Sequence, residues 1–393
     1  MNQEILNKAA ELINFTNGKI CNHCLGRKFS DCVEGNGNEE RGIKIRQALK
    51  LESYNDEECE ICHNIFKYIE DDVLDLVNEK IDFLKVEFDT FVVGCKLPKE
   101  INRQTGKLLE ANLKQNVDFD GEDVLVMVDF RRMFKENIEN PIKVRLQINP
   151  IFIEGRYRKL VRGIPQTKWP CTKCKGKGCE ECNFTGKQYP ESVEELLSDV
   201  VLKHTNGYEA KFHGAGREDI DVRMLGTGRP FVLEIKEPKI RKIDLEKIAE
   251  EVAVSAKGKT EYLNLKFSER KRKAEIKVSS PDTYKVYRAL VKCEDDIEEE
   301  DLEKLQTLHM IQQRTPIRVS HRRADKIREK EVKNIESKFI DSKTFEMIIK
   351  TEGGLYIKEL ISSDEGRSNP SVSEVLGTQA ICAELDVIEV GIK

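Results

Sequence analysis

Eight of the twelve cysteines stand in C-x-x-C pairs, and these pairs constrain the fold more than any other feature of the sequence. The first two pairs are Cys21/Cys24 and Cys59/Cys62, and the second two are Cys171/Cys174 and Cys179/Cys182. A C-x-x-C turn holds two thiolates on one side, and two such turns complete a tetrahedral Zn(Cys)₄ site. We therefore expect two structural metal sites that are closed by protein ligands and take no part in catalysis.

The nature of the ion is less constrained at the second quartet. Only four residues separate its two pairs, but Gly176 and Gly178 among them allow sharp turns. Structural zinc, one or two ions per chain, is the expected metal, and an iron–sulfur cluster is the alternative at this quartet because it also takes four thiolates. Unliganded thiols and a redox-active pair are the other interpretations. We expect no organic cofactor.

Composition places the chain in a broad class. A length of 393 residues exceeds one ordinary domain, and a charged fraction of 35% is too high for a membrane protein. The sequence has no apolar run of ~18 residues and no secretory signal at Met1–Ile5. We expect a cytoplasmic protein whose cysteines are reduced and which does not associate with membranes. The net charge of −5 argues mildly against a nucleic-acid ligand.

The hydrophobic patterns divide the chain into three parts. Helical spacing at 4–13 and 43–51 predicts a helical zinc-knuckle region over 1–75. Mixed patterns then predict an α/β region over 76–190, with a helix at 103–116, strands at 124–128 and 144–153, and the second cysteine loop at its end.

Residues 191–393 read as one α+β domain with a large, mainly antiparallel sheet. Apolar residues alternate at 231–235, 287–291 and 345–349, which predicts strands. Helical spacing predicts helices at 190–200, 245–254 and 299–308.

The densest cluster of charged residues lies in the glycine-bounded segment His213–Arg223. Carboxylates flanked by arginines on such a loop fit an ion-pair network, a catalytic acid near a phosphate, or a solvated turn. The P-loop pattern is absent, and no G-x-G-x-x-G follows a strand, so the sequence does not support a nucleotide cofactor site.

This segment resembles the catalytic loop of pseudouridine synthases, in which a G-R-x-D motif carries one essential aspartate. Three segments match family motifs in the family's usual order: Gly216–Asp219 (G-R-E-D), Lys285–Leu290 (K-V-Y-R-A-L) and Gly354–Leu360 (G-L-Y-I-K-E-L). The resemblance makes Asp219 the catalytic residue, with Asp221 as a competing candidate.

The resemblance extends along the chain. The N-terminal C-x-x-C-L-G-R segment, a THUMP-like middle and the run Arg314–Ala324 are similar to archaeal-type tRNA pseudouridine synthases of the tenth-named family. Members of that family isomerise uridines 54 and 55 in the TΨC arm of tRNA. The resemblance therefore implies an isomerase whose partner is tRNA and which needs no obligate protein partner.

The resemblance also implies roles for the remaining site residues. Lys358 is expected to pair with Asp219 and stabilise its negative charge, and Tyr287 to stack on the uracil or handle a sugar proton. Arg217 and Tyr356 would bind substrate. Further substrate contacts, to phosphates, are expected from a basic run that includes Arg318, His321 and Arg322. Without the resemblance, Lys358 would be interpreted as a surface cation, Tyr287 as a core aromatic residue and the basic run as a solvated edge.

Two other functions fit parts of the sequence. A non-catalytic zinc-ribbon RNA-binding protein would explain the cysteines and basic clusters but not the Asp219–Tyr287–Lys358 series. Another THUMP-containing tRNA-modifying enzyme, such as a methyltransferase, would need a nucleotide or methyl-donor fold, whose glycine signature is missing.

Overall fold

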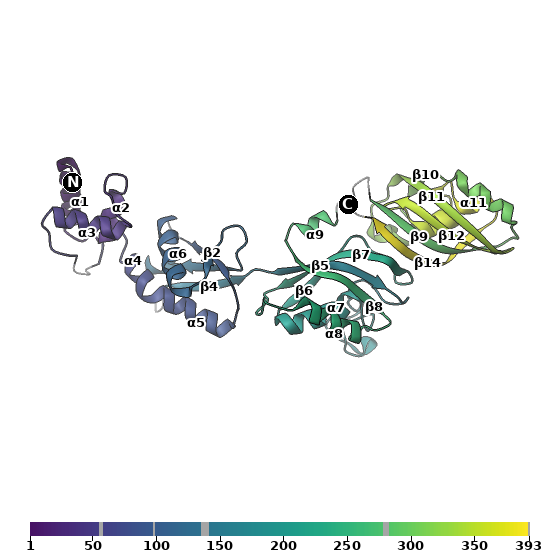
Figure 1. Cartoon of the computed structure of the whole chain (residues 1–393), viewed down its shortest axis with the longest axis horizontal. Helices are drawn as coiled ribbons and strands as arrows, with labels where there is room; N and C mark the ends of the chain where they lie inside the picture. The colour runs from purple at the N-terminus through teal and green to yellow at the C-terminus, as the bar shows by residue number, and fades with distance from the viewer. Residues whose placement is uncertain (55–57, 97–98, 135–140, 278–282, 392–393) are drawn as a thin grey trace. The chain divides into compact units, whose positions relative to one another are not determined.

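The chain forms two compact units, Met1–Asn149 and Pro150–Lys393. The computed structural model describes residues 1–54, 58–96, 99–134, 141–277 and 283–391 (Figure 1). The boundary expected at residue 190 does not coincide with this division. Strand β5 (Ile151–Lys159) pairs with β7 (Arg223–Lys236) on one side and β8 (Thr260–Ser268) on the other, so residues 150–190 belong to the second unit.

The first unit combines helices with a small sheet in the strand order β2-β1-β3-β4. Strand β1 runs parallel to β2 and β3, and β4 is antiparallel to β3. Its helices are α1 (Gln3–Phe15), α2 (Asn22–Lys28), α3 (Asn38–Ala48), α4 (Ile65–Tyr68), α5 (Leu74–Leu84) and α6 (Lys99–Leu113). Its strands are β1 (Thr90–Cys95), β2 (Asn116–Val117), β3 (Val124–Asp129) and β4 (Lys143–Ile148), and short turns of π and 3₁₀ helix span Ile69–Val73 and Arg131–Phe134.

Two glycines allow α2, which carries Cys24, to contact α3 backbone to backbone. A Cβ atom on Gly26 would lie 1.8 Å from the carbonyl oxygen of Asn38, and one on Gly42 would lie 2.1 Å from that of Asn22. Any side chain at either position would push the helices apart. The glycine that follows the first C-x-x-C pair is therefore a packing requirement of the fold.

The second unit is built on a ten-stranded sheet in the order β13-β10-β11-β12-β9-β14-β7-β5-β8, with β6 paired to β7 (Figure 1). Besides β5, β7 and β8, its strands are β6 (Glu209–Gly214), β9 (Tyr284–Cys293), β10 (Met310–Arg314), β11 (Ile327–Asp341), β12 (Thr344–Glu352), β13 (Ser368–Asn369) and β14 (Ala380–Gly391). Its helices are α7 (Val193–Thr205), α8 (Leu245–Ser255), α9 (Arg272–Glu275), α10 (Ile357–Ser362) and α11 (Val372–Leu376). Turns of 3₁₀ helix span Glu180–Cys182, Glu299–Thr307 and Ile317–Arg322.

The sheet confirms the α+β class expected from the sequence. Strands β7 and β14 are parallel, whereas the other described pairs of this sheet are antiparallel. Helices α7 and α8 pack together on the part formed by β5–β8 (Figure 1). Alternate residues of β9 and β12, such as Ala289 and Met347, are buried, as period-2 patterns predict. The segment expected as a helix at 299–308 is a 3₁₀ helix.

None of the helices in the described part of the chain combines the length and the apolar character needed to cross a bilayer.

A buried network of charges holds the loop between β6 and β7. The carboxylate of Glu218 accepts hydrogen bonds from the Tyr157 hydroxyl at 2.8 Å and 3.0 Å and from Arg229 Nε at 2.9 Å. Lys159 Nζ lies 3.8 Å from the same carboxylate. The side chains of Glu218 and Arg229 are each 1% exposed. Buried charges persist only when they are paired and hydrogen-bonded, so this network fixes the loop in one arrangement.

The partners of Glu218 also hold the loop backbone. Arg229 donates to the carbonyl of Ala215 at 2.9 Å, and Lys159 donates to the carbonyls of Ile164 and Asp219 at 2.9 Å and 3.0 Å. Two cations from β5 and β7 therefore pin the main chain on both sides of Glu218.

We expect Arg229→Ala to destabilise the second unit by ~3–5 kcal/mol, because it leaves the Glu218 carboxylate buried without its main counter-charge. Urea unfolding followed by the fluorescence of Trp169, the single tryptophan of the chain, reports on this unit. The exposed pair Lys304–Asp301 provides the control, since Lys304→Ala should cost less than ~1 kcal/mol. Equal effects of the two substitutions would contradict the role assigned to the network.

Candidate active site

A pocket of about 580 Å³ opens beside the loop that Glu218 anchors. Its walls come from this loop, β9, the 3₁₀ turn Ile317–Arg322 and the start of α10. Six of the site residues expected from the sequence line it: Arg217, Asp219, Tyr287, Arg318, Tyr356 and Lys358. The fold thus gathers three sequence motifs, which lie far apart along the chain, around one cavity of the size typical for small ligands.

Asp219 lies between two cations in this pocket. Its carboxylate is 2.9 Å from Arg318 Nη1 and 3.7 Å from Lys358 Nζ, and its side chain is 30% exposed. Two positive groups this close stabilise a negative charge on the carboxylate. Asp219 is therefore placed to act as a carboxylate that a ligand can still reach.

Asp221 occupies a different environment on the same loop. Its two oxygens accept hydrogen bonds from Lys358 Nζ at 2.8 Å and 2.6 Å, its side chain is 66% exposed, and it does not line the pocket. Burial is the largest influence on the pKa of Asp221 and raises it, but the hydrogen bond and the charge of Lys358, together with the charge of Arg318, lower it by more, so the pKa is lowered overall. The cation expected beside Asp219 therefore bonds chiefly to Asp221.

Arg318 takes the position next to Asp219 instead. It also pairs with the buried carboxylate of Glu359 on α10, and its guanidinium lies 5.7 Å from the centre of the Tyr356 ring. Glu359 fixes the direction of the guanidinium, so Arg318 reaches Asp219 in a defined geometry. Arg318, which the sequence suggested as a phosphate contact, thus lies beside the carboxylate of Asp219.

The start of α10 is held by a buried amide. Gln313 of β10 accepts a hydrogen bond from the Tyr356 N–H at 2.8 Å and donates to the Tyr356 carbonyl at 3.0 Å. Its amide also donates to Ser368 at 2.7 Å. These bonds fix the chain just before Lys358 and Glu359.

Tyr287 and Lys285 project from the same face of β9, because side chains two apart on a strand point the same way. Tyr287 is 8% exposed, and burial raises its pKa to about 12, so its phenol is neutral at physiological pH. Burial, reinforced by nearby Arg229, lowers the pKa of Lys285 to about 7. Sequence reasoning missed Lys285 as a site residue, although its spacing from Tyr287 in the K-x-Y motif was a usable signal.

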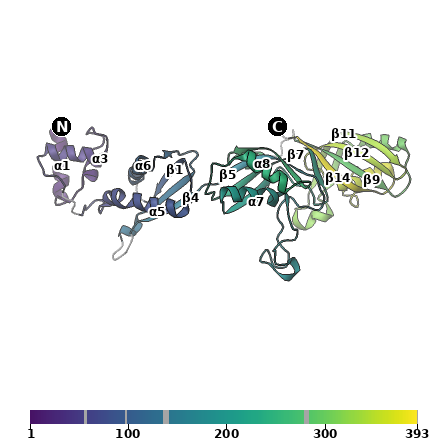
Figure 2. The same cartoon turned by 60° about the horizontal axis from the view of Figure 1, so that its bottom comes forward.

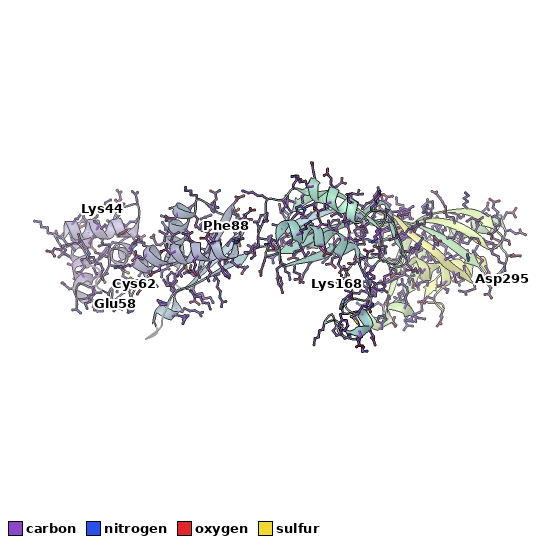
Figure 3. All side chains as sticks on the ribbon, turned by 90° about the horizontal axis from the view of Figure 1, so that it is seen from below. Lys44, Glu58, Cys62, Phe88, Lys168 and Asp295 are labelled. Carbon is purple, nitrogen blue, oxygen red and sulfur yellow. The ribbon has the colours of Figure 1, made fainter. Side chains whose placement is uncertain are left out.

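The segment that leads into the second cysteine loop contacts the loop between β6 and β7. Arg217 stacks its guanidinium 5.4 Å from the centre of the Trp169 ring. The cysteine loop projects from the second unit as a separate lobe in Figure 2, and Figure 3 labels Lys168 where it leaves the unit. The lobe is therefore tied to the residue two positions before Asp219.

The basic run after β10 is only partly brought to the pocket. His321 is exposed and does not line the cavity, whereas Arg323 does. The side chain of Arg322 lies outside the described residues. Arg318 reaches the pocket because Glu359 of α10 pairs with its guanidinium, whereas His321 is exposed near the end of the same turn.

Both cysteine quartets have the geometry of a metal site. Within each quartet the four sulfur atoms lie within 4.8 Å of one another. The pairs Cys21–Cys62 and Cys179–Cys182 are separated by 3.6 Å and 3.7 Å, close to the ~3.8 Å that Zn–S bonds of ~2.3 Å give in a tetrahedron. Backbone N–H groups also point at the sulfurs, as from Gly186 to Cys182 at 3.2 Å. These residues fit a four-coordinate soft metal ion.

The chain is similar to known proteins along nearly its whole length. A protein called tRNA pseudouridine synthase Pus10 from Methanothermobacter marburgensis is 50% identical over 402 residues, covering 97% of both chains. Proteins of the same name from Methanocaldococcus jannaschii and Pyrococcus furiosus are 43% and 40% identical, and cover 97% and 98% of this chain and 94% and 98% of their own.

Solved structures give more distant matches. A Cbf5–Nop10–Gar1 complex contains a chain that is 17% identical, with a TM-score of 0.34, over 60% of this chain and 49% of its own. A structure described as a pseudouridylate synthase is 12% identical, with a TM-score of 0.22, over 74% and 84% of the two chains. These scores are too low to support an argument about the fold.

The family described as "Pus10, C-terminal" matches residues 152–391, which is nearly the whole of the second unit and includes every residue of the pocket. Together with relatives that are 40–50% identical over almost the full length, this match shows that the chain belongs to the Pus10 family.

Proposed function

We propose that this protein is a tRNA pseudouridine synthase that isomerises uridines 54 and 55 in the TΨC arm, with Asp219 as its single catalytic carboxylate. Its relatives carry the name tRNA pseudouridine synthase Pus10. The observation that carries the assignment of the residue is the position of Asp219, which lines the pocket 2.9 Å from Arg318, whereas Asp221 does not line it.

The reaction breaks the N1–C1′ glycosidic bond, turns the uracil and joins C5 to C1′. A proton leaves C5 and one is gained at N1, so no oxidant, reductant or nucleotide cofactor is required. The carboxylate of Asp219 attacks or stabilises the electron-poor sugar or base during this exchange. Arg318 and Lys358 hold that carboxylate in position from two sides.

The target uridine must leave the stacked arm to reach the pocket. Tyr287 offers an apolar ring face for the extruded uracil, and its neutral phenol suits this role better than that of a base. Backbone contacts elsewhere must offset the cost of extrusion. On the first unit, the described residues that line a pocket of about 840 Å³ include five cations, Lys96, Arg131, Arg132, Lys143 and Arg145, and one carboxylate, Asp129. We assign RNA binding to this THUMP-like surface.

Zinc is the ion that best fits both cysteine quartets. Four thiolates and no open ligand position describe a structural site, which stabilises the local fold. At the second quartet, this stabilisation would hold Trp169 under Arg217.

Replacing Asp219 by Asn should lower kcat by more than ~10³-fold, since the change removes the proposed nucleophile. Tritium release from unmodified tRNA labelled at C5 of uridine measures this directly. Asp221→Asn is the matched control, because it makes the same change on the same loop, and it should retain activity within about tenfold. Loss of activity only in Asp221→Asn would transfer the role to that residue.

Tyr287→Phe should keep most of the activity, whereas Tyr287→Leu should lose the ~1–3 kcal/mol that base–aromatic stacking contributes, or about 5–150-fold. Single-turnover rates on the same labelled tRNA separate the two cases. If the Phe variant is as slow as the Leu variant, the hydroxyl takes part in proton transfer.

Elemental analysis should find about two zinc ions per chain, because each Cys₄ set binds one ion. Cys59→Ser and Cys182→Ser should each remove about one, and each should lower the thermal stability of its own unit. Iron bound at the second quartet, with the visible absorbance of a cluster, would contradict the assignment of zinc there.

A further inference from the structure

A second pocket adjoins the catalytic pocket and has a different charge. It has a volume of about 630 Å³, and every charged residue that lines its described walls is a cation. We call it the basic groove and define it by these six residues: Arg217, Lys277, Lys285, Arg323, Arg328 and Lys330. In a chain with a net charge of −5, six cations with no carboxylate among the described lining residues are a pronounced local excess.

The basic groove and the catalytic pocket share a wall. Arg217, Lys285, Tyr287, Arg323 and Tyr356 line both cavities. A polymer whose one unit occupies the catalytic pocket can therefore extend into the groove without leaving the protein surface.

The cations of the groove have few counter-charges of their own. Among the described residues, only Lys330 has a carboxylate within 4 Å, that of Glu352 at 2.5 Å. Arg328 donates instead to the hydroxyl of Thr315 at 3.2 Å. Like charges that are gathered without acidic partners raise the local potential and attract an external anion.

Lys285 stands at the junction of the two cavities. A Cβ atom on Gly216, whose φ is +83°, would lie 3.4 Å from Lys285 Nζ and 3.2 Å from Arg229 Nη1. Glycine therefore lets the ammonium group sit against the start of the catalytic loop. Its lowered pKa reflects burial close to Arg229, and an anion bound there would stabilise the charged form.

We propose that the basic groove binds the phosphates of nucleotides next to the target uridine, with Lys285 as the anchor where the groove meets the catalytic pocket. The inference rests on the proposed function, since it takes the ligand to be single-stranded RNA that continues from an extruded base. Tyr284 and Tyr356 line the groove and offer ring faces for neighbouring bases. Cations interleaved with aromatic rings are typical of surfaces that bind single strands.

The test uses a double variant of groove residues that do not line the catalytic pocket, Lys277→Gln/Arg328→Gln. The probe is an unmodified TΨC-arm stem-loop RNA, with binding measured by fluorescence anisotropy on the full chain. We expect a Kd at least ~10-fold weaker and a salt dependence of log K shallower by about 0.7 for each lost contact.

The matched control is Lys257→Gln/Lys338→Gln, which removes the same charge from exposed positions. Lys338 lies on β11 like Arg328 but roughly 30 Å farther along the strand. The control should bind the stem-loop within about twofold of the unsubstituted protein. Equal weakening by both double variants would mean that only net charge matters, and unchanged binding by the groove variant would also overturn the proposal.

A second measurement locates the contact on the RNA. Methylphosphonate linkages, which carry no charge, replace the phosphates on either side of the target. They should weaken binding to the unsubstituted protein and have little further effect on the groove variant, since the same contacts are already lost. Additive losses would place these phosphates elsewhere. Because binding is read without turnover, failure of the groove is distinguishable from failure of the proposed function, which would show as RNA binding without tritium release.

Discussion

The buried carboxylate of Glu218 is the interaction on which the arrangement of the site depends. It immediately precedes Asp219. Arg229 balances its charge inside the protein, and the Tyr157 hydroxyl donates hydrogen bonds to it. A surface loop of this length would sample many conformations, at a cost of ~1–2 kcal/mol per ordered residue. Here any displacement of the loop would leave a buried charge without its partner. The network thus fixes the backbone position of Asp219, while the side chain of Asp219 stays accessible.

Around Asp219, outside the buried network of Glu218, each cation contacts two carboxylates rather than one. Arg318 contacts both Asp219 and Glu359, and Lys358 contacts both Asp219 and Asp221. Arg318 lies closer to Glu359 than to Asp219, and Lys358 lies closer to Asp221, so neither cation pairs with Asp219 alone. Asp219 therefore has positive groups on two sides while its remaining surface faces the cavity. This division gives two aspartates on one loop different chemical environments.

Much of this organisation could be predicted from local sequence. The C-x-x-C spacings predicted two four-sulfur clusters, period-2 patterns predicted β9 and β12, and the three motifs predicted which segments meet at the pocket. The cation closest to Asp219 could not be predicted, because Arg318 lies 99 positions away and its direction is set by Glu359, a contact of the folded chain. Glu218 is also a polar residue that hydropathy assigns to the surface, and only its partners in the fold explain its burial.

The net charge of the chain is also a poor guide to the site, because it averages over residues that lie far from it. A chain average of −5 argues against a polyanionic ligand only if the charges are evenly distributed. In the second unit they are not: acidic residues such as Glu299, Glu300 and Asp301 occupy one 3₁₀ turn, whereas the cations of the basic groove converge from β9, β11 and the loops beside them. The potential felt by a ligand decays within ~8 Å at physiological salt, so it depends on the residues around the site rather than on the sum over the chain. A protein with a negative total charge can therefore present a positive surface beside the carboxylate of Asp219.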